Sequence, residues 1–193
     1  MTDISALFHR QPWAIVILGG GLFLILSWVI ALRPALDFRA ADAARPKPAA
    51  ADPAVERGRR LYLAEGCGFC HSQFVRPLFV DAPYGRASTA DDYAGATPPL
   101  LGTERTGPDL SDAGGRQPSP IWNLMHLFNP RSVVPQSVMP AYPWYFDIVD
   151  QDKAPADPYL VTLPEPWLPA GKVAVPRSEA LDLTAYILSL RQG

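Results

Sequence analysis

The segment Cys67-Gly68-Phe69-Cys70-His71 constrains the fold more strongly than any other stretch of this chain. Two thiols three residues apart can both reach the vinyl groups of one haem, and the next residue can then ligate the iron through a ring nitrogen. Cys67 and Cys70 are the only cysteines in the sequence, so no thiol is left for another role. The pattern predicts one covalently bound c-type haem, attached to Cys67 and Cys70, with His71 as an axial ligand of the iron.

Other interpretations of the two cysteines make different demands on the sequence. A structural zinc site takes four Cys or His ligands, usually in two pairs, and the other histidines, His9 and His126, form no second pair. A thiol oxidoreductase of the thioredoxin type needs its cysteines at the start of a helix within a βαβ unit, which no pattern near residue 67 indicates. A disulfide across so short a loop would stabilise the fold little. The thiol oxidoreductase and the zinc-binding module remain the alternatives from other functional classes.

Length and composition limit the architecture further. With 193 residues and a formal net charge of −2, the chain has room for one modest domain plus attachments, and its charge gives no indication of nucleic acid binding. Proline is abundant, with 22 residues, so we expect long loops and few helical segments.

An apolar run lies well before the haem motif. Residues 13–32 contain no charged side chain, and at about 1.5 Å per residue a helix of this length crosses a hydrocarbon core of about 30 Å. Trp13 and Trp28 lie towards its two ends, where aromatic rings suit the membrane interface. The three glycines at residues 19–21 would let a neighbouring transmembrane helix approach closely. A cleaved signal peptide is the alternative, but the run is long for one and the small-residue site at 41–43 lies too far beyond it.

The chain is therefore expected to have four parts. We predict a short N-terminal segment at residues 1–12, a transmembrane anchor helix at 13–32 and a semi-extended linker rich in alanine and proline at 33–54. The rest, residues 55–193, is predicted to form a monohaem domain.

Helices are expected near both ends of the haem domain. The first is predicted to begin with Asp52 as its N-cap, and Gly58 on its apolar face predicts that another helix crosses it closely. The candidate for that second helix is residues 179–190, with Ser178 as the cap. A further short helix is predicted at residues 121–128.

The second axial ligand must come from a distant part of the chain. Met139, followed by Pro140 in an extended segment, resembles the methionine-ligand loop of c-type cytochromes. Met125 lies within the predicted helix at 121–128 and is better explained as a core residue. His126 is the rival ligand, because coordination by two imidazoles is chemically sound. With Met139 as ligand the iron has no open position, so the haem is expected to pass electrons without binding a substrate.

The arrangement as a whole resembles small c-type cytochromes, in which the terminal helices cross and the haem is attached just after the first. Gly58, Tyr62, the haem motif and Tyr186 carry this resemblance. It implies an all-α, class I-like cytochrome c domain with long proline-rich loop insertions, on a single N-terminal transmembrane helix. It also implies that the carbonyl of Pro108 accepts a hydrogen bond from His71 and orients the imidazole.

A closer resemblance rests on several segments in order. These are the haem motif with Ser72-Gln73, Arg76-Pro77, Tyr84-Gly85, Arg105-Thr106-Gly107-Pro108-Asp109-Leu110, Gly114-Gly115-Arg116, His126 to Pro135, and Met139-Pro140-Ala141-Tyr142-Pro143-Trp144. In this order they resemble the membrane-anchored monohaem subunit (FixO or CcoO) of cbb(3)-type cytochrome c oxidases. The resemblance implies an electron carrier that is not an enzyme by itself. It would pass electrons on the periplasmic side to a b-type haem of a large haem–copper catalytic subunit.

The resemblance also bears on the haem propionates and on the membrane. It implies that Arg131 lies close to the haem, as a partner for a propionate. Other candidate partners from residue type are Arg76, Arg105, Arg116, Trp122, Tyr142 and Trp144. The chain would sit in the bacterial inner (cytoplasmic) membrane as a single-pass protein with a periplasmic haem domain. This orientation contradicts the excess of Lys and Arg after the apolar run, which the positive-inside rule would place in the cytoplasm.

Related arrangements remain open at this stage. The anchored cytochrome c subunit of a nitric oxide reductase is one alternative, and a freestanding, membrane-anchored donor cytochrome is another. Additional partners would be further cytochrome c subunits or a soluble electron donor.

Overall fold

The computed structural model describes residues 12–44, 52–93, 96, 98–102 and 104–192. The chain divides into two compact units, Met1–Pro48 and Ala49–Gly193, and each is considered by itself. Most of the expected N-terminal segment at residues 1–12, and residues 45–51 of the expected linker, lie outside the described residues.

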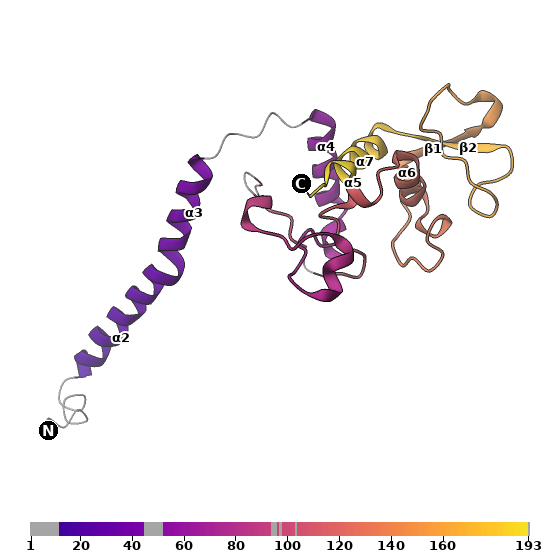
Figure 1. The fold of residues 1–193 in the computed structure, drawn as a ribbon. Coiled ribbons are helices and arrows are strands. Elements are labelled where there is room, and N and C mark those ends of the chain that lie inside the picture. The colour runs from indigo at the N-terminus through magenta and orange to yellow at the C-terminus, as the bar shows by residue number, and fades with distance from the viewer. Residues whose placement is uncertain (1–11, 45–51, 94–95, 97, 103, 193) are drawn as a thin grey trace. The chain divides into compact units, whose positions relative to one another are not determined.

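The first unit is a continuous helix, made of α2 (Pro12–Ser27), a π-helical turn (Trp28–Leu32) and α3 (Arg33–Ala44) (Figure 1). Within it, Trp13–Asp37 is long and apolar enough to cross a membrane, and most of its large apolar side chains are exposed within the chain. A Cβ atom added at Gly19, Gly20 or Gly21 would meet nothing within 4 Å. This apolar surface is explained by a lipid environment or a neighbouring helix.

The predicted semi-extended linker is wrong over its first part, because residues 33–44 continue the helix. Pro34 falls directly after the π-helical turn, where the Arg33 N–H bonds to the Trp28 carbonyl five residues earlier. This altered hydrogen-bond spacing accommodates a residue that lacks an N–H group. The alanine-rich sequence that follows favours a helix, and an ion pair between Arg33 and Asp37, one turn apart, adds to it at 3.0 Å.

The second unit is organised around α4 (Pro53–Ala64) and α7 (Ser178–Ser189), which lie side by side in Figure 1. The Asp52 side chain accepts a hydrogen bond from the Ala54 N–H at 2.8 Å, which confirms the predicted N-cap. The N-cap of α7 is Arg177 and not Ser178, which is the first residue of the helix. The predicted cap is therefore displaced by one residue, and no side chain caps this end.

Gly58 allows the two helices to cross closely, as the sequence predicts. A Cβ atom at this position would lie 2.0 Å from the carbonyl oxygen of Asp182 in α7. The carboxylate of Asp182 accepts two hydrogen bonds from Arg57, at 2.6 and 2.8 Å. The rings of Tyr62 and Tyr186 meet edge to face beside the crossing, with centroids 5.4 Å apart.

Short elements connect these helices. The predicted third helix is present as α6 (Pro120–Phe128); Ser119 caps it by accepting a hydrogen bond from the Trp122 N–H at 3.2 Å. It packs on α7 and contributes Leu124, Leu127 and Phe128 to the core. The remaining short elements are α5 (Ala113–Arg116) and 3₁₀ turns at Cys67–Phe69, Phe79–Tyr84, Ala90–Tyr93, Pro130–Ser132, Pro143–Tyr145 and Gln151–Lys153.

The expectation of an all-α domain is wrong in one region, although the fold is mostly helical. Strands β1 (Phe146–Asp150) and β2 (Lys172–Pro176) pair in antiparallel register, from Phe146 opposite Pro176 to Asp150 opposite Lys172. Both strands are rich in apolar, mostly β-branched residues, and the prolines that predicted a loop lie at or beyond their ends. Phe146 anchors the ribbon to the core through an edge-to-face contact with Phe128, with centroids 5.3 Å apart.

We predict that Gly58→Ala destabilises the haem domain. Alanine favours a helix over glycine by roughly 0.5–1 kcal/mol, but here its methyl group would collide with the α7 backbone, which cannot rotate away. The expected net loss is about 3 kcal/mol in the free energy of unfolding, measured by urea denaturation followed by circular dichroism. Gly68→Ala is the matched control, because its Cβ would meet nothing nearer than 3.9 Å. Equal stability of the two variants would contradict the proposed close crossing.

Candidate haem site

The turn that carries both cysteines begins where α4 ends. Gly66 adopts a left-handed conformation with φ of 69°, and a Cβ there would also meet the Phe69 ring at 2.8 Å. The chain then forms a 3₁₀ turn, in which the N–H groups of Cys70 and His71 both bond to the Cys67 carbonyl, at 3.1 and 2.9 Å. Both thiols and the imidazole are thus presented by one compact loop.

The chemistry of the thiols disfavours a dithiol enzyme. Neither cysteine is in a disulfide; Cys67 is half-buried and Cys70 is exposed. Burial raises the pKa of the Cys67 thiol to about 11, so at neutral pH this group is protonated and a poor nucleophile. A structural zinc site also lacks ligands, since no group of three or more His, Cys, Asp or Glu side chains among the described residues is arranged to hold a metal ion.

Residues 107–108 contact the imidazole of His71 and orient it. Its Nδ1 lies 2.8 Å from the carbonyl oxygen of Pro108, so the hydrogen bond implied by the resemblance is present. Because a carbonyl can only accept, Nδ1 carries the proton, and Nε2 of the neutral ring keeps its lone pair for a metal. Burial lowers the pKa of His71, which favours that neutral form. Gly107 packs on the ring, and a Cβ there would lie 2.3 Å from Cε1.

Met139 lies in a loop that is held by backbone contacts. Nη1 of Arg131 donates to the carbonyl oxygens of Ser137 and Met139, at 3.0 and 3.1 Å, and the Met139 N–H bonds to Oγ of Ser137 at 3.2 Å. The Met139 side chain is partly buried against the hydrophobic core. Arg131 therefore positions the methionine loop, a role that sequence reasoning missed when it considered Arg131 only as a propionate partner.

The loop of Met139 and the cysteine turn are brought together by Tyr142. The side chains of Tyr142 and Cys67 lie close enough that each affects the pKa of the other. The Tyr142 N–H also bonds to the Leu127 carbonyl at 2.9 Å, which links this segment to the end of α6. Tyr142 packs edge to face on Trp144, with centroids 5.2 Å apart. Two predicted propionate donors thus belong to one aromatic cluster beside the cysteine turn.

His126 supplies a polar atom with no partner among the described residues. Its ring stacks on Trp122 at a centroid distance of 4.9 Å, and its Nδ1 is buried without a hydrogen bond. Burial, together with the nearby His71, lowers the pKa of His126 to about 4. An orphaned imidazole nitrogen near His71 fits a site that receives a group with its own polar edge, as a haem has in its propionates.

Three of the arginines predicted to bind propionates are engaged within the protein. Arg76 and Arg105 both pair with Asp81, with closest N···O distances of 2.8 and 2.5 Å, and Asp81 is fully buried. The two guanidinium groups hold the pKa of the Asp81 carboxyl far below its usual range. Arg116 donates to the backbone carbonyl of Asp109. Sequence reasoning missed Asp81, although an acid within the apolar segment 78–83 is a signal for a buried ion pair.

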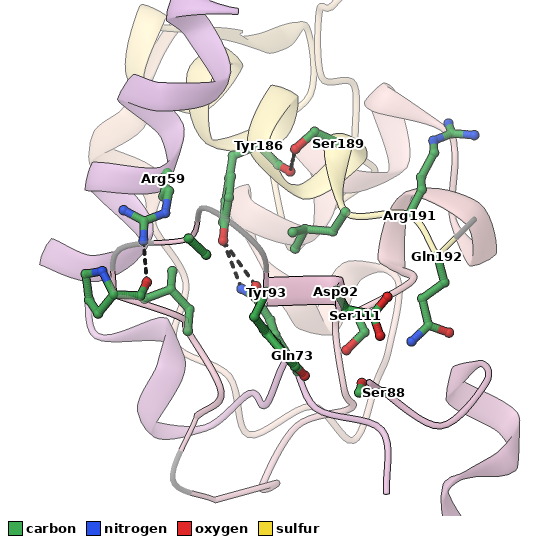
Figure 2. A pocket seen from close by; sticks show the side chains of 14 residues that line it. Arg59, Gln73, Ser88, Asp92, Tyr93, Ser111, Tyr186, Ser189, Arg191 and Gln192 are labelled. Atoms are coloured by element: carbon green, nitrogen blue, oxygen red, sulfur yellow. Dashed lines mark hydrogen bonds between the residues drawn. The ribbon is translucent and has the colours of Figure 1, made fainter. Parts of the chain in front are cut away.

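Figure 2 shows a separate hollow, which lies among α4, α7 and the described residues of the loop at 88–93, 96, 98 and 100. Its volume is about 280 Å³, and its lining is polar and apolar in equal parts, with Arg59, Tyr93 and Gln192 among the contributing side chains. Tyr186 and Gln73 also line it and hydrogen-bond to each other at 3.0 Å. None of the predicted haem-binding residues lines this hollow. The lining residue nearest in the sequence to the haem motif is Gln73, two residues after His71.

The cysteine loop, the oriented imidazole and the methionine segment are residues that could hold a haem, and they follow in the chain a helix able to cross a membrane. Comparison with known families agrees. Residues 9–161 match the family described as cytochrome c oxidase, mono-haem subunit/FixO. The chain belongs to this family of mono-haem subunits of cytochrome c oxidase complexes. No curated protein matched the chain.

Asp81 leads to a prediction about acid stability. Its folded-state pKa is depressed below the unfolded value of about 3.9, so its stabilising contribution is present above that pH and is lost as the pH falls through the folded-state value. We expect Asp81→Asn to lower the stability of the domain at pH 7 and to flatten the acid limb of the stability profile. Urea denaturation from neutral to acid pH measures both.

The control for this prediction is Asp150→Asn. This carboxylate lies at the surface between Lys153 and Lys172, so its removal should cost much less at pH 7. Similar losses of stability in the two variants would show that the burial of Asp81 adds nothing to the free energy of unfolding.

Proposed function

We propose that this chain is the anchored electron-transfer subunit of a cbb(3)-type oxidase and carries one c-type haem. Cys67 and Cys70 form the thioether bonds, and His71 and Met139 are the axial ligands. The observation that carries the proposal is the hydrogen bond of 2.8 Å from His71 to Pro108, which leaves the lone pair of Nε2 available in the residue that directly follows the two free cysteines. The haem supplies a one-electron couple when bound.

The surrounding residues orient the ligands and exclude water. Pro108 and Gly107 set the orientation of the His71 ring, and Arg131 secures the backbone that carries Met139. His126, Tyr142 and Trp144 are proposed to face the polar edge of the haem, together with Arg131 in a lesser role. With both axial positions taken by protein, the chain itself carries electrons and does not reduce oxygen.

The direction of electron flow is proposed from the resemblance to the cbb(3)-type subunit. Electrons enter on the periplasmic side of the bacterial inner membrane and pass to a b-type haem of the large haem–copper catalytic subunit. A further cytochrome c subunit or a soluble donor supplies them. The match to an oxidase subunit favours this function over the nitric oxide reductase alternative. The single anchor helix α2–α3 is proposed to pack on the catalytic subunit through its three glycines at 19–21.

Purification of the full chain from membranes in mild detergent tests this assignment. A pyridine haemochrome spectrum should show haem c bound to the chain and haem b co-purifying with it, and the preparation should consume oxygen. Leucine at positions 19, 20 and 21 should reduce the haem b that co-purifies, because larger side chains keep a neighbouring helix at a distance. The control is Ile15→Leu with Val16→Leu, which adds leucine away from the glycines.

Two results would contradict parts of this proposal. If the chain contains no haem c, the proposed haem attachment is wrong, and Cys67 and Cys70 would belong to a thiol oxidoreductase or a zinc-binding module. Full retention of haem b in the leucine variant would exclude the glycine face as the contact with the catalytic subunit.

We predict that Met139→Ala keeps the covalently bound haem but lowers its midpoint potential. The thioether sulfur favours reduced iron, so its loss shifts the couple towards the oxidised form. A spectroelectrochemical titration of the purified chain gives the potential. Met125→Ala is the matched control, because Met125 packs against the core from α6 and its loss should leave the potential close to that of the wild type. An unchanged potential in Met139→Ala would exclude Met139 as a ligand.

A further inference from the structure

A buried set of polar side chains adjoins the hydrogen bond between His71 and Pro108. Its members are Asp109 and Ser72, the chain neighbours of Pro108 and His71, together with Arg105 and Asp81. The exposed fraction is 0% for both Asp81 and Asp109 and 7% for Ser72. Burying two carboxylates is costly unless each is paired and fully hydrogen-bonded, so the contacts of these residues determine the local geometry.

Asp109 connects residues 72–74 with its own segment, residues 109–111. Its Oδ2 accepts hydrogen bonds from Oγ of Ser72 at 2.6 Å and from the Phe74 N–H at 2.8 Å. Its Oδ1 accepts one from the Ser111 N–H at 2.8 Å. Backbone bonds on either side, from Gly107 N–H to the Cys70 carbonyl and from Leu110 N–H to the Ser72 carbonyl, are both 2.8 Å long. Segment 107–111 is thus hydrogen-bonded to residues 70–74, and Pro108 lies opposite His71.

Ser72 and Arg105 extend this connection to Asp81, within the loop insertion between His71 and Gly107. Oγ of Ser72 donates to Asp109 and accepts from Nε of Arg105 at 2.7 Å. Arg105 also donates to the Phe74 carbonyl at 2.6 Å and pairs with Asp81. The guanidinium of Arg105 further lies over the ring of Tyr84, 5.4 Å from its centroid. A continuous path of polar contacts therefore runs from Asp81 through Arg105 and Ser72 to Asp109.

We propose that Asp109, together with Ser72, is a positioning pair that fixes the Pro108 carbonyl against Nδ1 of His71 and thereby sets the midpoint potential of the haem. A stronger hydrogen bond at Nδ1 makes the imidazole a more basic ligand, which favours oxidised iron. A looser segment 107–110 weakens that bond and raises the potential. This inference deepens the proposed function and rests on it, because it requires that His71 ligates the haem iron.

Two variants separate geometry from charge. Asp109→Asn removes a buried negative charge and also disturbs the hydrogen bonds to Ser72 and Phe74, so both effects raise the potential. Ser72→Ala changes no charge. It removes the hydroxyl that bridges Asp109 and Arg105, and it leaves their direct ion pair at 3.5 Å in place. A shift in Ser72→Ala therefore reports positioning alone. Asp150→Asn is the matched control for charge, since its carboxylate belongs to a surface ion pair at the end of β1.

The experiment uses the full-length chain purified in detergent with its haem. The midpoint potentials of the wild type and the variants are measured by spectroelectrochemical titration, and the paramagnetically shifted resonances of the axial histidine are recorded by NMR for the oxidised proteins. We expect an upward shift of potential in both Ser72→Ala and Asp109→Asn, displaced histidine resonances in Ser72→Ala, and a wild-type potential in Asp150→Asn.

The remaining outcomes each decide the inference. A Ser72→Ala protein with wild-type potential and histidine resonances would overturn it, even if Asp109→Asn shifts, because the buried charge alone would then be acting. If Asp109→Asn does not retain haem, the Ser72→Ala result decides. If the wild-type chain contains no haem c, the proposed function itself fails, and the haemochrome spectrum distinguishes that case from failure of the positioning role alone.

Discussion

The close approach of α4 and α7 at Gly58 is the contact on which the rest of the haem domain depends. The site begins two residues after α4 ends, so the position of that helix determines where the cysteine turn starts. At the crossing, Tyr186 of α7 reaches Gln73, two residues beyond His71, through a hydrogen bond of 3.0 Å. The packing of two helices from opposite ends of the domain thereby affects the segment that carries His71, the proposed axial ligand.

Several charged side chains of this protein form ion pairs and hydrogen bonds that stabilise the structure around the site. Arg76, Arg105 and Arg116 were expected beside the haem propionates, yet each is committed to an acid or carbonyl within the protein. Such groups are stable in the interior only as satisfied networks, and a satisfied network is rigid. The loop insertion between His71 and Gly107 therefore has a structural role, because its Asp81 pairs with Arg105. Arg131 is also bound within the protein, because it donates to the backbone carbonyl of Met139 and so holds the methionine loop.

Proline content was the least reliable guide to the fold. Pro34 predicted an extended linker, but a π-helical turn before it lets the helix continue to Ala44. Between Met139 and α7 the prolines predicted a long loop, whereas the residues between them pair as β1 and β2. In both cases the positions of the prolines relative to the hydrogen-bonding N–H groups, and not the number of prolines, decided the outcome.

The sequence by itself determined the features that depend on local spacing. These include the cysteine turn with its histidine, the apolar helix, the cap at Asp52, the close crossing at Gly58 and the family to which the chain belongs. The tertiary structure decided which partners the buried polar groups take. The pairing of Asp81 with Arg105 and the bridge from Ser72 to Asp109 join residues that are distant in the sequence. The fold also buries Nδ1 of His126 without a hydrogen-bond partner among the described residues. Such contacts depend on which side chains the folded core leaves without water, and a linear pattern carries no record of that.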